Sequence, residues 1–211
     1  MATVTAKFTR MQDGTAEEYA AIEEADAKYF ADLPGRVAAA VAGLAKEGLG
    51  GYAVDRTQHS LQSATRAHRA GEDVEYVVAA LVHDVGDPLA PFSHGRLAAS
   101  MLKPFVSPRI TWIIEQHPVF QMYFYAPHMG GTRDARERFR GHEWFDDAAY
   151  FCEHYDENCF DPNFDTLQLD FFRPMLNEVF GRTPNFPETA AHIKKLWQLE
   201  ASRLLANRAK G

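Results

Sequence analysis

Apolar residues recur every three or four positions along most of the chain, which is the spacing that lines one face of an α-helix. The strict alternation that marks a half-buried strand is nearly absent, and no long linker divides the sequence. Glycine and proline separate the periodic segments. The pattern predicts helices over residues 15–31, 34–44, 56–70, 74–85, 93–102, 108–117, 133–140, 144–157, 167–180 and 188–209.

Short local signals predict several of the helix ends. Thr15, followed three residues later by Glu18, has the pattern of a capping box. Asp73 is placed to cap the helix that begins after it, and Gly86 followed by Pro88 predicts where that helix ends. These signals support a chain built from helices joined by short turns.

The composition favours a single globular domain. The chain has 211 residues, of which 46% are hydrophobic and 24% charged, so it can bury a substantial core. Residues 1–14 precede the first periodic segment, and we expect them to form a poorly ordered arm. Internal repeats are absent from the sequence.

Charge and cysteine usage narrow the class of partner. The net charge is -7 and no block of lysine and arginine occurs, so nucleic acid is not an expected partner. No run approaches the roughly 20 apolar residues of a membrane span, and the N-terminus does not resemble a signal peptide. Cys152 and Cys159 do not form a Cys-x-x-Cys pair. We therefore expect a cytoplasmic protein with a small-molecule substrate, and the oligomeric state stays open.

The pair His83-Asp84 draws attention because it lies near the end of a strongly apolar predicted helix. Asp84 shares a side of that helix with apolar residues, and a bare carboxylate there would cost several kcal/mol unless it were paired or bound to a metal. The two oxygens of a carboxylate can bridge two metal ions. The chain also contains nine histidines, which is the compositional feature that needs an explanation.

Further histidine and aspartate residues are predicted to face the same interior. If no metal were bound, each buried polar group would need its own hydrogen-bonding partner, whereas one metal site would satisfy all of them together. Imidazole and carboxylate ligands without thiolates suit iron, manganese or zinc. The candidate metal ligands, drawn from five predicted helices, are His59, His83, Asp84, His94, His117 and Asp156.

The order His59, His83-Asp84, Asp156 resembles the His…His-Asp…Asp pattern of the HD-domain superfamily. The runs His59-Ser60-Leu61-Gln62-Ser63-Ala64 and Ala79-Ala80-Leu81-Val82-His83-Asp84-Val85-Gly86 are similar to those of the HD-type mixed-valent diiron oxygenases. Within that branch the chain looks most similar to bacterial hydroxyphosphonate oxygenases, including the 1-hydroxy-2-trimethylaminoethylphosphonate type. The resemblance extends over roughly residues 50–162.

The resemblance implies an all-α HD-domain helical bundle with a dinuclear metal site in its core. Residues 1–211 would form a single HD domain, with a core at about 50–162 and the N- and C-terminal helices packed around it. The implied cofactors are two iron ions (Fe(II)/Fe(III)), with O2 as co-substrate. The implied reaction oxidises a small hydroxylated organophosphonate and cleaves its C–P bond, which releases phosphate.

The resemblance also implies a role for each candidate ligand. Asp84 would bridge the two irons and take part in catalysis. His59, His83 and Asp156 would hold one iron, and His94 and His117 the other. By order and spacing alone, Asp161 is an alternative to Asp156, but Asp156 falls on the apolar side of its predicted helix whereas Asp161 precedes Pro162 in a predicted loop.

Some members of this branch guard the metal with a mobile tyrosine and a nearby acid. Tyr52 with Asp55 is one candidate pair in this chain, although its spacing to the first ligand differs from that of the family. Tyr29 with Glu23 or Glu24 is the second. An aromatic side chain packed on the core is the simpler interpretation of Tyr52.

The residues expected around the substrate depart from those of the aminoethylphosphonate type. The resemblance to that type implies a histidine and a lysine at the positions where this chain has Asp87 and Gln121. Both changes remove positive charge. Asp87, together with Tyr125 and neighbouring aromatics, would suit a quaternary ammonium group, with cation–π attraction of roughly 0.5–2 kcal/mol per ring. The other candidates, for which core or surface roles are simpler, are Phe120, Tyr123, Phe124, Tyr155, His128, His142, His154 and the arginines of residues 133–140.

Two other functions fit the same ligands. One is a dinuclear HD-domain phosphohydrolase acting on a nucleotide or phosphate ester, with one metal activating water. The lack of a basic cluster near the ligands argues against it. The other is a non-catalytic scaffold that keeps a metal for stability, although purely structural sites are usually closed and mononuclear.

Overall fold

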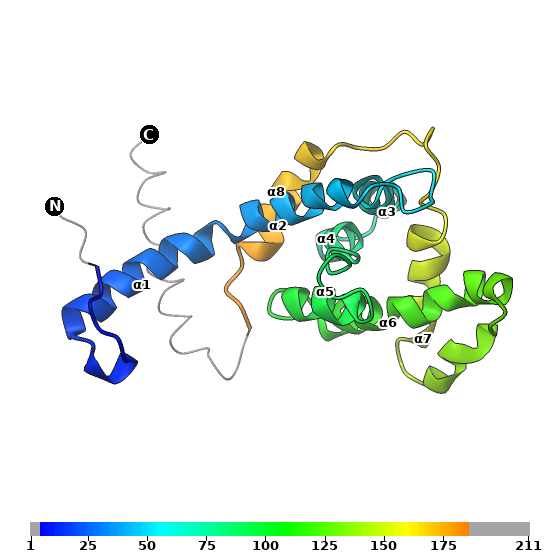
Figure 1. Cartoon of the computed structure of the whole chain (residues 1–211). Coiled ribbons are helices and arrows are strands. Elements are labelled where there is room, and N and C mark those ends of the chain that lie inside the picture. Colours follow the sequence, from blue (N-terminus) through cyan, green and yellow to red (C-terminus); the bar gives the residue numbers. More distant parts are fainter. Residues whose placement is uncertain (1–4, 186–211) are drawn as a thin grey trace.

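The computed structural model describes residues 5–185 (Figure 1). Residues 1–4 and the predicted helix over residues 188–209 lie outside this part of the chain. Within residues 5–185 the regular structure is entirely helical, which confirms the all-α prediction. The α-helices are α1 (Ala16–Ala31), α2 (Leu33–Gly43), α3 (Arg56–Ala70), α4 (Val74–Val82), α5 (His94–Leu102), α6 (Pro108–Tyr125), α7 (Phe145–Phe151) and α8 (Leu169–Phe180). The shorter turns are the 3-10 segments η1 (Met11–Asp13), η2 (Leu44–Glu47), η3 (Ala126–Met129) and η4 (Arg133–Phe139), and the π-helical segment η5 (Cys152–Asp156).

Helix α4 lies at the centre of the bundle because it is apolar on nearly every side. Every residue from Tyr76 to Val82 is buried. A helix of this kind is stable only when other elements cover it all round. Helices α3, α6 and α8 pack against it, α5 and α7 pack against α6, and α2 packs against α8 (Figure 1). The end of α4 therefore delivers the residues that follow it into the interior.

Several helix ends follow their sequence signals. Thr15 and Glu18 form the predicted capping box, in which each side chain accepts a hydrogen bond from the other residue's backbone N–H. The Asp73 carboxylate accepts a hydrogen bond of 2.9 Å from the backbone N–H of Tyr76 at the start of α4. Gly71 ends α3 in the left-handed conformation, with φ of 84°, which glycine adopts without steric cost.

Two helices differ from their predicted length at the positions that matter most. Helix α4 ends at Val82, three residues earlier than predicted, so His83 and Asp84 lie in the turn that follows it. Helix α6 continues through Pro118 to Tyr125, where the sequence predicted an interruption. In both places a backbone carbonyl loses the N–H donor that a regular helix would supply. The side chains of His83 and His117 contact these carbonyls, which belong to Ala80 and Ile114.

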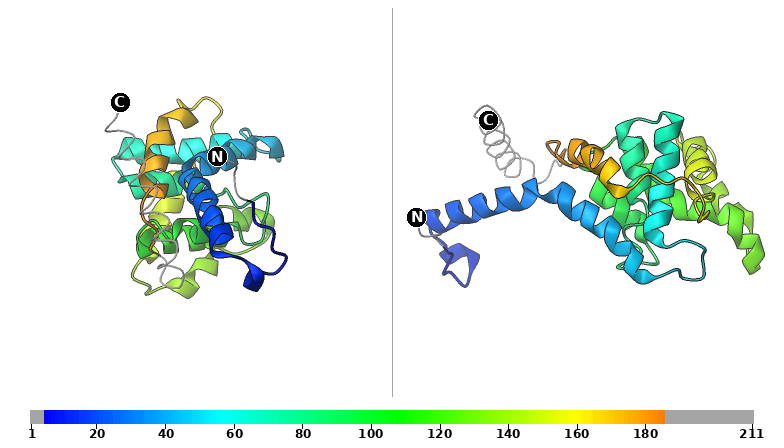
Figure 2. Two further views of the ribbon diagram at one scale, coloured as in Figure 1. Left: turned by 90° about the vertical axis from the view of Figure 1, so that its left-hand side faces the viewer. Right: turned by 90° about the horizontal axis from the view of Figure 1, so that it is seen from above.

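Helix α1 extends away from the bundle as an arm (Figure 2). Ala27 is its one buried residue, and the helix begins to contact the bundle only through α2. The resemblance had implied that the N-terminal helix packs around the core, but the small and acidic residues of α1 give it too narrow an apolar face for such packing. Residues 5–14, expected to be poorly ordered, fold back along α1, where Phe8 stacks on Tyr19 with ring centroids 5.4 Å apart.

Candidate metal centre

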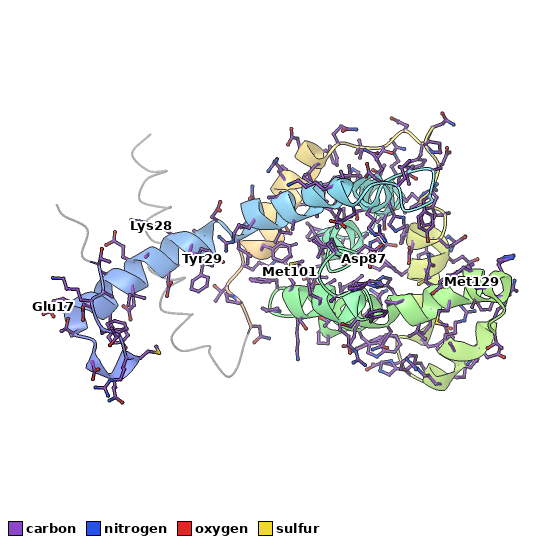
Figure 3. The ribbon with its side chains drawn as sticks, viewed as in Figure 1. Glu17, Lys28, Tyr29, Asp87, Met101 and Met129 are labelled. Atoms are coloured by element: carbon purple, nitrogen blue, oxygen red, sulfur yellow. The ribbon has the colours of Figure 1, made fainter. Side chains whose placement is uncertain are left out.

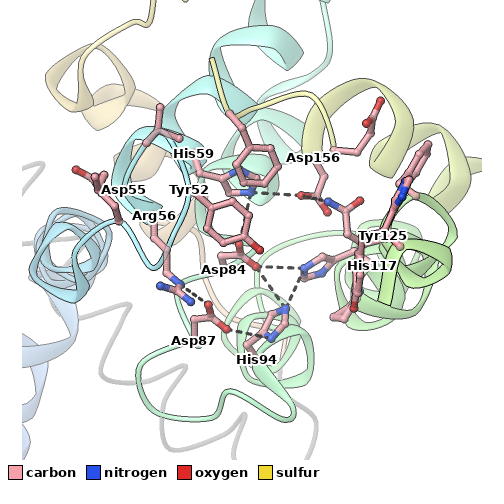
Figure 4. Close-up of a pocket in the computed structure, with 18 residues that line it drawn as sticks. Tyr52, Asp55, Arg56, His59, Asp84, Asp87, His94, His117, Tyr125 and Asp156 are labelled. Atoms are coloured by element: carbon pink, nitrogen blue, oxygen red, sulfur yellow. Dashed lines mark hydrogen bonds and ion pairs between the residues drawn. The ribbon is translucent and has the colours of Figure 1, made fainter. Parts of the chain in front are cut away.

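A cavity of about 400 Å³ opens where four parts of the bundle meet (Figure 4). The start of α3 forms one wall, and the turn after α4 with the first residue of α5 forms the floor. The middle of α6 and the π-helical segment η5 complete it. Five of the six predicted metal ligands line this cavity, and the sixth, His83, is fully buried directly beneath it.

The first group of donors consists of His59, His83 and Asp156. The Nε2 atoms of the two histidines lie 3.0 Å apart. Asp156 Oδ1 lies 3.3 Å from the Nε2 atom of His59 and 3.7 Å from that of His83. All three residues are buried, with exposed fractions of 4%, 0% and 3%. These three residues form one group with the spacing of metal ligands.

The second group consists of His94 and His117, whose Nε2 atoms lie 3.3 Å apart. Asp84 stands between the two groups (Figure 4). Its Oδ2 atom lies 3.5 Å from the Nε2 atoms of both His59 and His83. Its Oδ1 atom lies 3.4 Å from that of His94 and 3.3 Å from that of His117. One carboxylate thus offers one oxygen to each group.

Backbone carbonyls set the tautomers of the two histidines in the first group. The Nδ1 atom of His59 lies 3.2 Å from the carbonyl oxygen of Cys159, and that of His83 lies 2.8 Å from the carbonyl oxygen of Ala80. A carbonyl oxygen only accepts hydrogen bonds, so each Nδ1 carries the proton. In the neutral imidazole each Nε2 then keeps its lone pair, which faces the carboxylates of Asp84 and Asp156.

Pro118 explains the orientation of His117. A proline has no backbone N–H, so it cannot donate to the carbonyl oxygen of Ile114 four residues earlier. The side chain of His117 takes over this acceptor, with Nδ1 2.7 Å from the Ile114 oxygen. The proton is held on Nδ1, and Nε2 points at Asp84 and His94. The contact thus satisfies the carbonyl that the proline leaves without a helical donor, and it fixes the orientation of a predicted ligand at the same time.

The π-helical segment places Asp156. The backbone N–H of Glu157 donates to the carbonyl oxygen of Cys152, five residues earlier, at 2.9 Å. A wider turn of this kind is rare and is often found at functional sites. Gln121 Nε2 donates to Asp156 Oδ1 at 3.0 Å, while Asp156 Oδ2 is buried without a partner. Asp161 instead accepts a hydrogen bond from the backbone N–H of Asn163, so the geometry favours Asp156 over it.

The pKa values of this cluster show that its donors require a positive charge among them. Burial raises the pKa of Asp84 and Asp156, but contacts with the neighbouring histidines outweigh it and hold both pKa values below the ordinary aspartate value. Burial alone lowers the pKa of His83, but the charges of Asp84 and Asp156 overcome this and raise it to about 9. Imidazole nitrogens and two ionised carboxylates that face one another repel unless a positive charge, from a proton or from a bound cation, lies among them. The donors therefore fit bound cations.

Thiolates take no part in this arrangement. The Sγ atom of Cys152 donates to the carbonyl oxygen of His117, and that of Cys159 donates to the carbonyl oxygen of Tyr155. Burial raises the pKa of both thiols. The donor set is thus imidazole and carboxylate, which suits iron, manganese or zinc. The buried histidine and aspartate groups could hold a metal.

The predicted substrate residues are only partly gathered at the cavity, which is lined by Tyr52, Asp87, Gln121 and Tyr125. Tyr29 is not among its lining residues. It lies on the projecting helix α1 (Figure 3), is 59% exposed, and stacks on the Arg36 guanidinium at 3.7 Å. The alternative of Tyr29 with Glu23 or Glu24 as a guard is therefore wrong within one chain, because α1 extends away from the bundle.

Aromatic rings form a stack over the first donor group. Phe160 stacks on the His59 ring with centroids 4.7 Å apart, and Tyr52 stacks on the other side of Phe160 at 5.0 Å. Phe160 was missed in the sequence because it lies in an irregular segment without periodicity. Asp55, the predicted partner of Tyr52, instead caps α3 by accepting a hydrogen bond from Gln58.

The other aromatic and histidine candidates separate into two sets. Phe124 and His128 line the cavity. The remaining aromatic and histidine side chains pack elsewhere: Phe120 on Phe145, Tyr123 near Arg136, Tyr155 with its hydroxyl donating to Glu72, His142 on Trp112 and His154 on Tyr150. The arginines of residues 133–140 also stay outside the cavity lining.

Arg56 is a cavity residue that the sequence did not single out. Its Nε atom donates to Asp87 Oδ2 at 2.5 Å, and the other oxygen of Asp87 lies 3.2 Å from His94 Nδ1. Asp87 is thus engaged on both oxygens and offers no free charge to a cationic ligand. Nothing in the local sequence pairs Arg56 with a residue 31 positions away, so only the fold could reveal this contact.

Comparison with known proteins supports the superfamily resemblance. The model of the family described as HD domain matches residues 56–140, which contain five of the six donors, and agrees with the all-helical bundle. Members of that family are typically metal-dependent enzymes. No curated protein matches the chain at a significant level. Within residues 5–185 no helix combines the length and the apolar character that a membrane crossing requires.

Proposed function

We propose that this protein is an HD-domain diiron oxygenase that uses O2 to oxidise a small hydroxylated organophosphonate and cleave its C–P bond, releasing phosphate. The observation that carries this proposal is the position of Asp84, which turns one oxygen to His59 and His83 and the other to His94 and His117. A bridging carboxylate between two imidazole groups is what a pair of metal ions requires.

The proposed ligand sets follow these two sides of Asp84. His59, His83 and Asp156 would hold one iron, His94 and His117 the other, and Asp84 both. When bound, the two irons would supply O2 activation and would polarise the hydroxyl and phosphonate oxygens of the substrate.

The protein's own side chains have three tasks in this proposal. The side chains of His59, His83 and His117 contact carbonyl oxygens through Nδ1, which directs their Nε2 atoms at the site before any metal arrives. Gln121 fixes Asp156 Oδ1, which limits the ways in which that carboxylate can rotate. The stacked rings of Tyr52 and Phe160, together with the ring of Tyr125, line the cavity and give a bound substrate apolar surfaces to pack against.

The charges that line the cavity limit how a cationic group on the substrate could be bound. Because both Asp87 oxygens are engaged, a quaternary ammonium group would rely on the rings of Tyr52, Phe124, Tyr125 and Phe160. Cation–π attraction of about 0.5–2 kcal/mol per ring corresponds to at most a few tens of fold in affinity per ring. Comparing trimethylammonium and unsubstituted hydroxyphosphonates in the same assay would measure this preference.

Metal analysis and oxygen uptake test the proposed activity together. Protein purified in air should contain two irons per chain and should consume O2 and release phosphate when a 1-hydroxyphosphonate is added. Manganese, magnesium or zinc, with hydrolysis of phosphate esters and no O2 uptake, would contradict the oxygenase and support the HD-domain phosphohydrolase. A chain that binds metal but has neither activity would support a scaffold.

The variant His117→Ala tests the ligand assignment separately. It removes one donor of the second group, so metal content should fall from two ions to about one and O2 uptake should be lost. His142→Ala is the matched control, because His142 packs on Trp112 outside the cavity. Retention of two ions in His117→Ala would show that the second set of ligands is misassigned.

A further inference from the structure

The four histidines of the candidate metal centre do not have equivalent partners. Three of them direct Nδ1 to a main-chain carbonyl alone: His59, His83 and His117. The Nδ1 atom of His94 instead lies 3.2 Å from a carboxylate oxygen of Asp87, and 3.4 Å from the carbonyl oxygen of Pro91. Of the four, His94 is also the most exposed, with 19% of its side chain accessible.

Arg56 holds Asp87 in this position. Its Nε–H donates to Asp87 Oδ2 at 2.5 Å, while Asp87 Oδ1 faces His94. The backbone N–H of Asp87 also donates to the carbonyl oxygen of Asp84 at 3.0 Å, so the turn that places Asp84 also places Asp87. The side chain of Asp87 is only 17% exposed. The carboxylate is thus engaged on both oxygens, its main chain is held by the turn, and it is not free to turn to a ligand.

We propose that Asp87, held by Arg56, is a positioning residue that orients His94 for metal binding. The carboxylate keeps the proton of His94 on Nδ1 and directs Nε2 towards Asp84 Oδ1 and His117. This inference rests on the proposed two-metal site, and it replaces the predicted role of Asp87 as a contact for substrate.

The physical reason lies in the weak anchoring of His94. Its backbone contact, to Pro91, is the longest of the four Nδ1 contacts to carbonyls and comes from a loop. A carboxylate on the second nitrogen of a metal-binding imidazole fixes the ring and raises its basicity, and losing such a partner typically lowers metal affinity 10–100-fold. The effect should fall on the ion held by His94 and His117 and leave the other in place.

The test is metal binding by the full-length chain, using Fe(II) under anaerobic conditions. The wild type should bind two ions. In Asp87→Asn the second ion, held by His94 and His117, should bind about 10–100-fold more weakly. The affinity for the first ion should be unchanged. Asp87→Ala should weaken it at least as much, while Asp87→Glu should recover part of the loss. Arg56→Gln should reproduce the direction of the effect with a smaller loss.

Glu157→Gln provides the matched control. Glu157 lines the same cavity, so the variant removes one negative charge there without touching His94. If it weakens the second ion as much as Asp87→Asn does, the cause is cavity charge and the positioning role is overturned. Two tightly bound ions in Asp87→Ala would also overturn it. Thermal unfolding of each metal-free variant, expected within a few degrees of wild type, separates these results from a loss of fold.

The same measurements separate this inference from the proposed function. A wild type that binds two ions, with Asp87→Asn losing only one, supports the positioning role whatever reaction the loaded enzyme catalyses. A wild type that binds fewer than two ions contradicts the dinuclear site and the positioning role with it. A wild type with two irons, no O2 uptake and an unaffected Asp87→Asn variant contradicts both proposals independently.

Discussion

At the residue scale, most side chains of the candidate metal centre use one nitrogen or oxygen in a hydrogen bond to the protein and direct the other towards the neighbouring donors. His83 shows this most clearly, because Nδ1 contacts the carbonyl oxygen of Ala80 while Nε2 faces Asp84 and Asp156. In the metal-free protein a proton is the available substitute for a cation. This is why the neighbouring carboxylates raise the pKa of His83 to about 9.

A pH dependence of stability follows from this raised pKa. The folded-state pKa of His83 lies above its ordinary value of 6.5, so its protonation stabilises the folded, metal-free chain below pH 6.5, and this contribution is lost as the pH rises through 9. We expect the free energy of unfolding of the metal-free protein to fall between pH 6.5 and 9. Urea unfolding at a series of pH values measures it.

The metal-loaded protein serves as the control for this prediction. A bound cation replaces the proton among the same donors, so its unfolding should not show the alkaline loss over that interval. Equal pH profiles for the metal-free and loaded forms would show that His83 is not protonated in the folded metal-free state.

The sequence indicated which histidines and aspartates gather at the candidate metal centre better than it indicated the residues around them. His59, His83-Asp84 and Asp156 could be chosen because polar residues on apolar helix faces need a reason to be buried. Arg56 could not be chosen, because its partner Asp87 is distant in sequence and its pattern is that of any charged residue at a helix start. Contacts between polar side chains of separate elements depend on the packing, which periodicity does not describe.

At the element scale, close packing between α5 and α6 brings His94 to His117. A Cβ atom added to Gly95 would lie 2.8 Å from the carbonyl oxygen of Ile114 and 2.9 Å from Pro118 Cδ. The absence of a side chain therefore lets the two helices approach at the position of the proline. Helix periodicity predicted both helices, but it gave no measure of how closely they cross.

Gly95→Ala should consequently destabilise the protein. The new methyl group must push α5 away from α6 or strain α6 at Pro118, at a cost of about 1–3 kcal/mol. It should also weaken binding of the ion that we propose is held by His94 and His117. Chemical unfolding and Fe(II) titration measure the two effects.

Gly43→Ala, in helix α2, is the matched control for this variant. A Cβ atom there would meet nothing within 4 Å, and alanine in a helix is favoured over glycine by roughly 0.5–1 kcal/mol. It should leave stability unchanged or slightly raised, with normal metal binding. Similar losses in both variants would mean that the α5–α6 crossing is not the cause.

At the scale of the whole molecule, the site belongs to the bundle and not to the arm. Helices α3, α5 and α6, the turn after α4 and the π-helical segment supply all the candidate ligands, and the buried end of α4 positions the central pair. Helix α1 contributes no residue to the cavity lining. The all-helical architecture was predictable from periodicity. The direction of α1 was not predictable, because a helix with a weak apolar face gives no indication of which element it will pack against.

Removal of residues 1–31 should therefore leave the metal centre intact. We expect the shortened protein to fold, with Fe(II) stoichiometry equal to that of the full chain, because α2 retains its packing against α8. Helical content by circular dichroism and metal analysis provide the measurement. Loss of metal binding on this truncation would show that the arm supports the site.

Removal of residues 1–44 is the contrasting truncation. It would also delete α2, whose buried residues include Val37 and Val41. Exposing the matching apolar surface of α8 should prevent stable folding. If this longer truncation folds as well as the shorter one, the contribution of α2 to the core is smaller than its burial indicates.

The wide turn that carries Asp156 also affects how this chain can be compared with others. Each residue along a regular helix advances by about 100°, so one residue more or less between Phe145 and Asp156 would turn a neighbouring side chain towards the histidines. A homologue with an ordinary turn at this point would present its acid one position away in the alignment. Matching such sequences without a gap here would assign the ligand to Tyr155 or Glu157, neither of which lies among the first donor group.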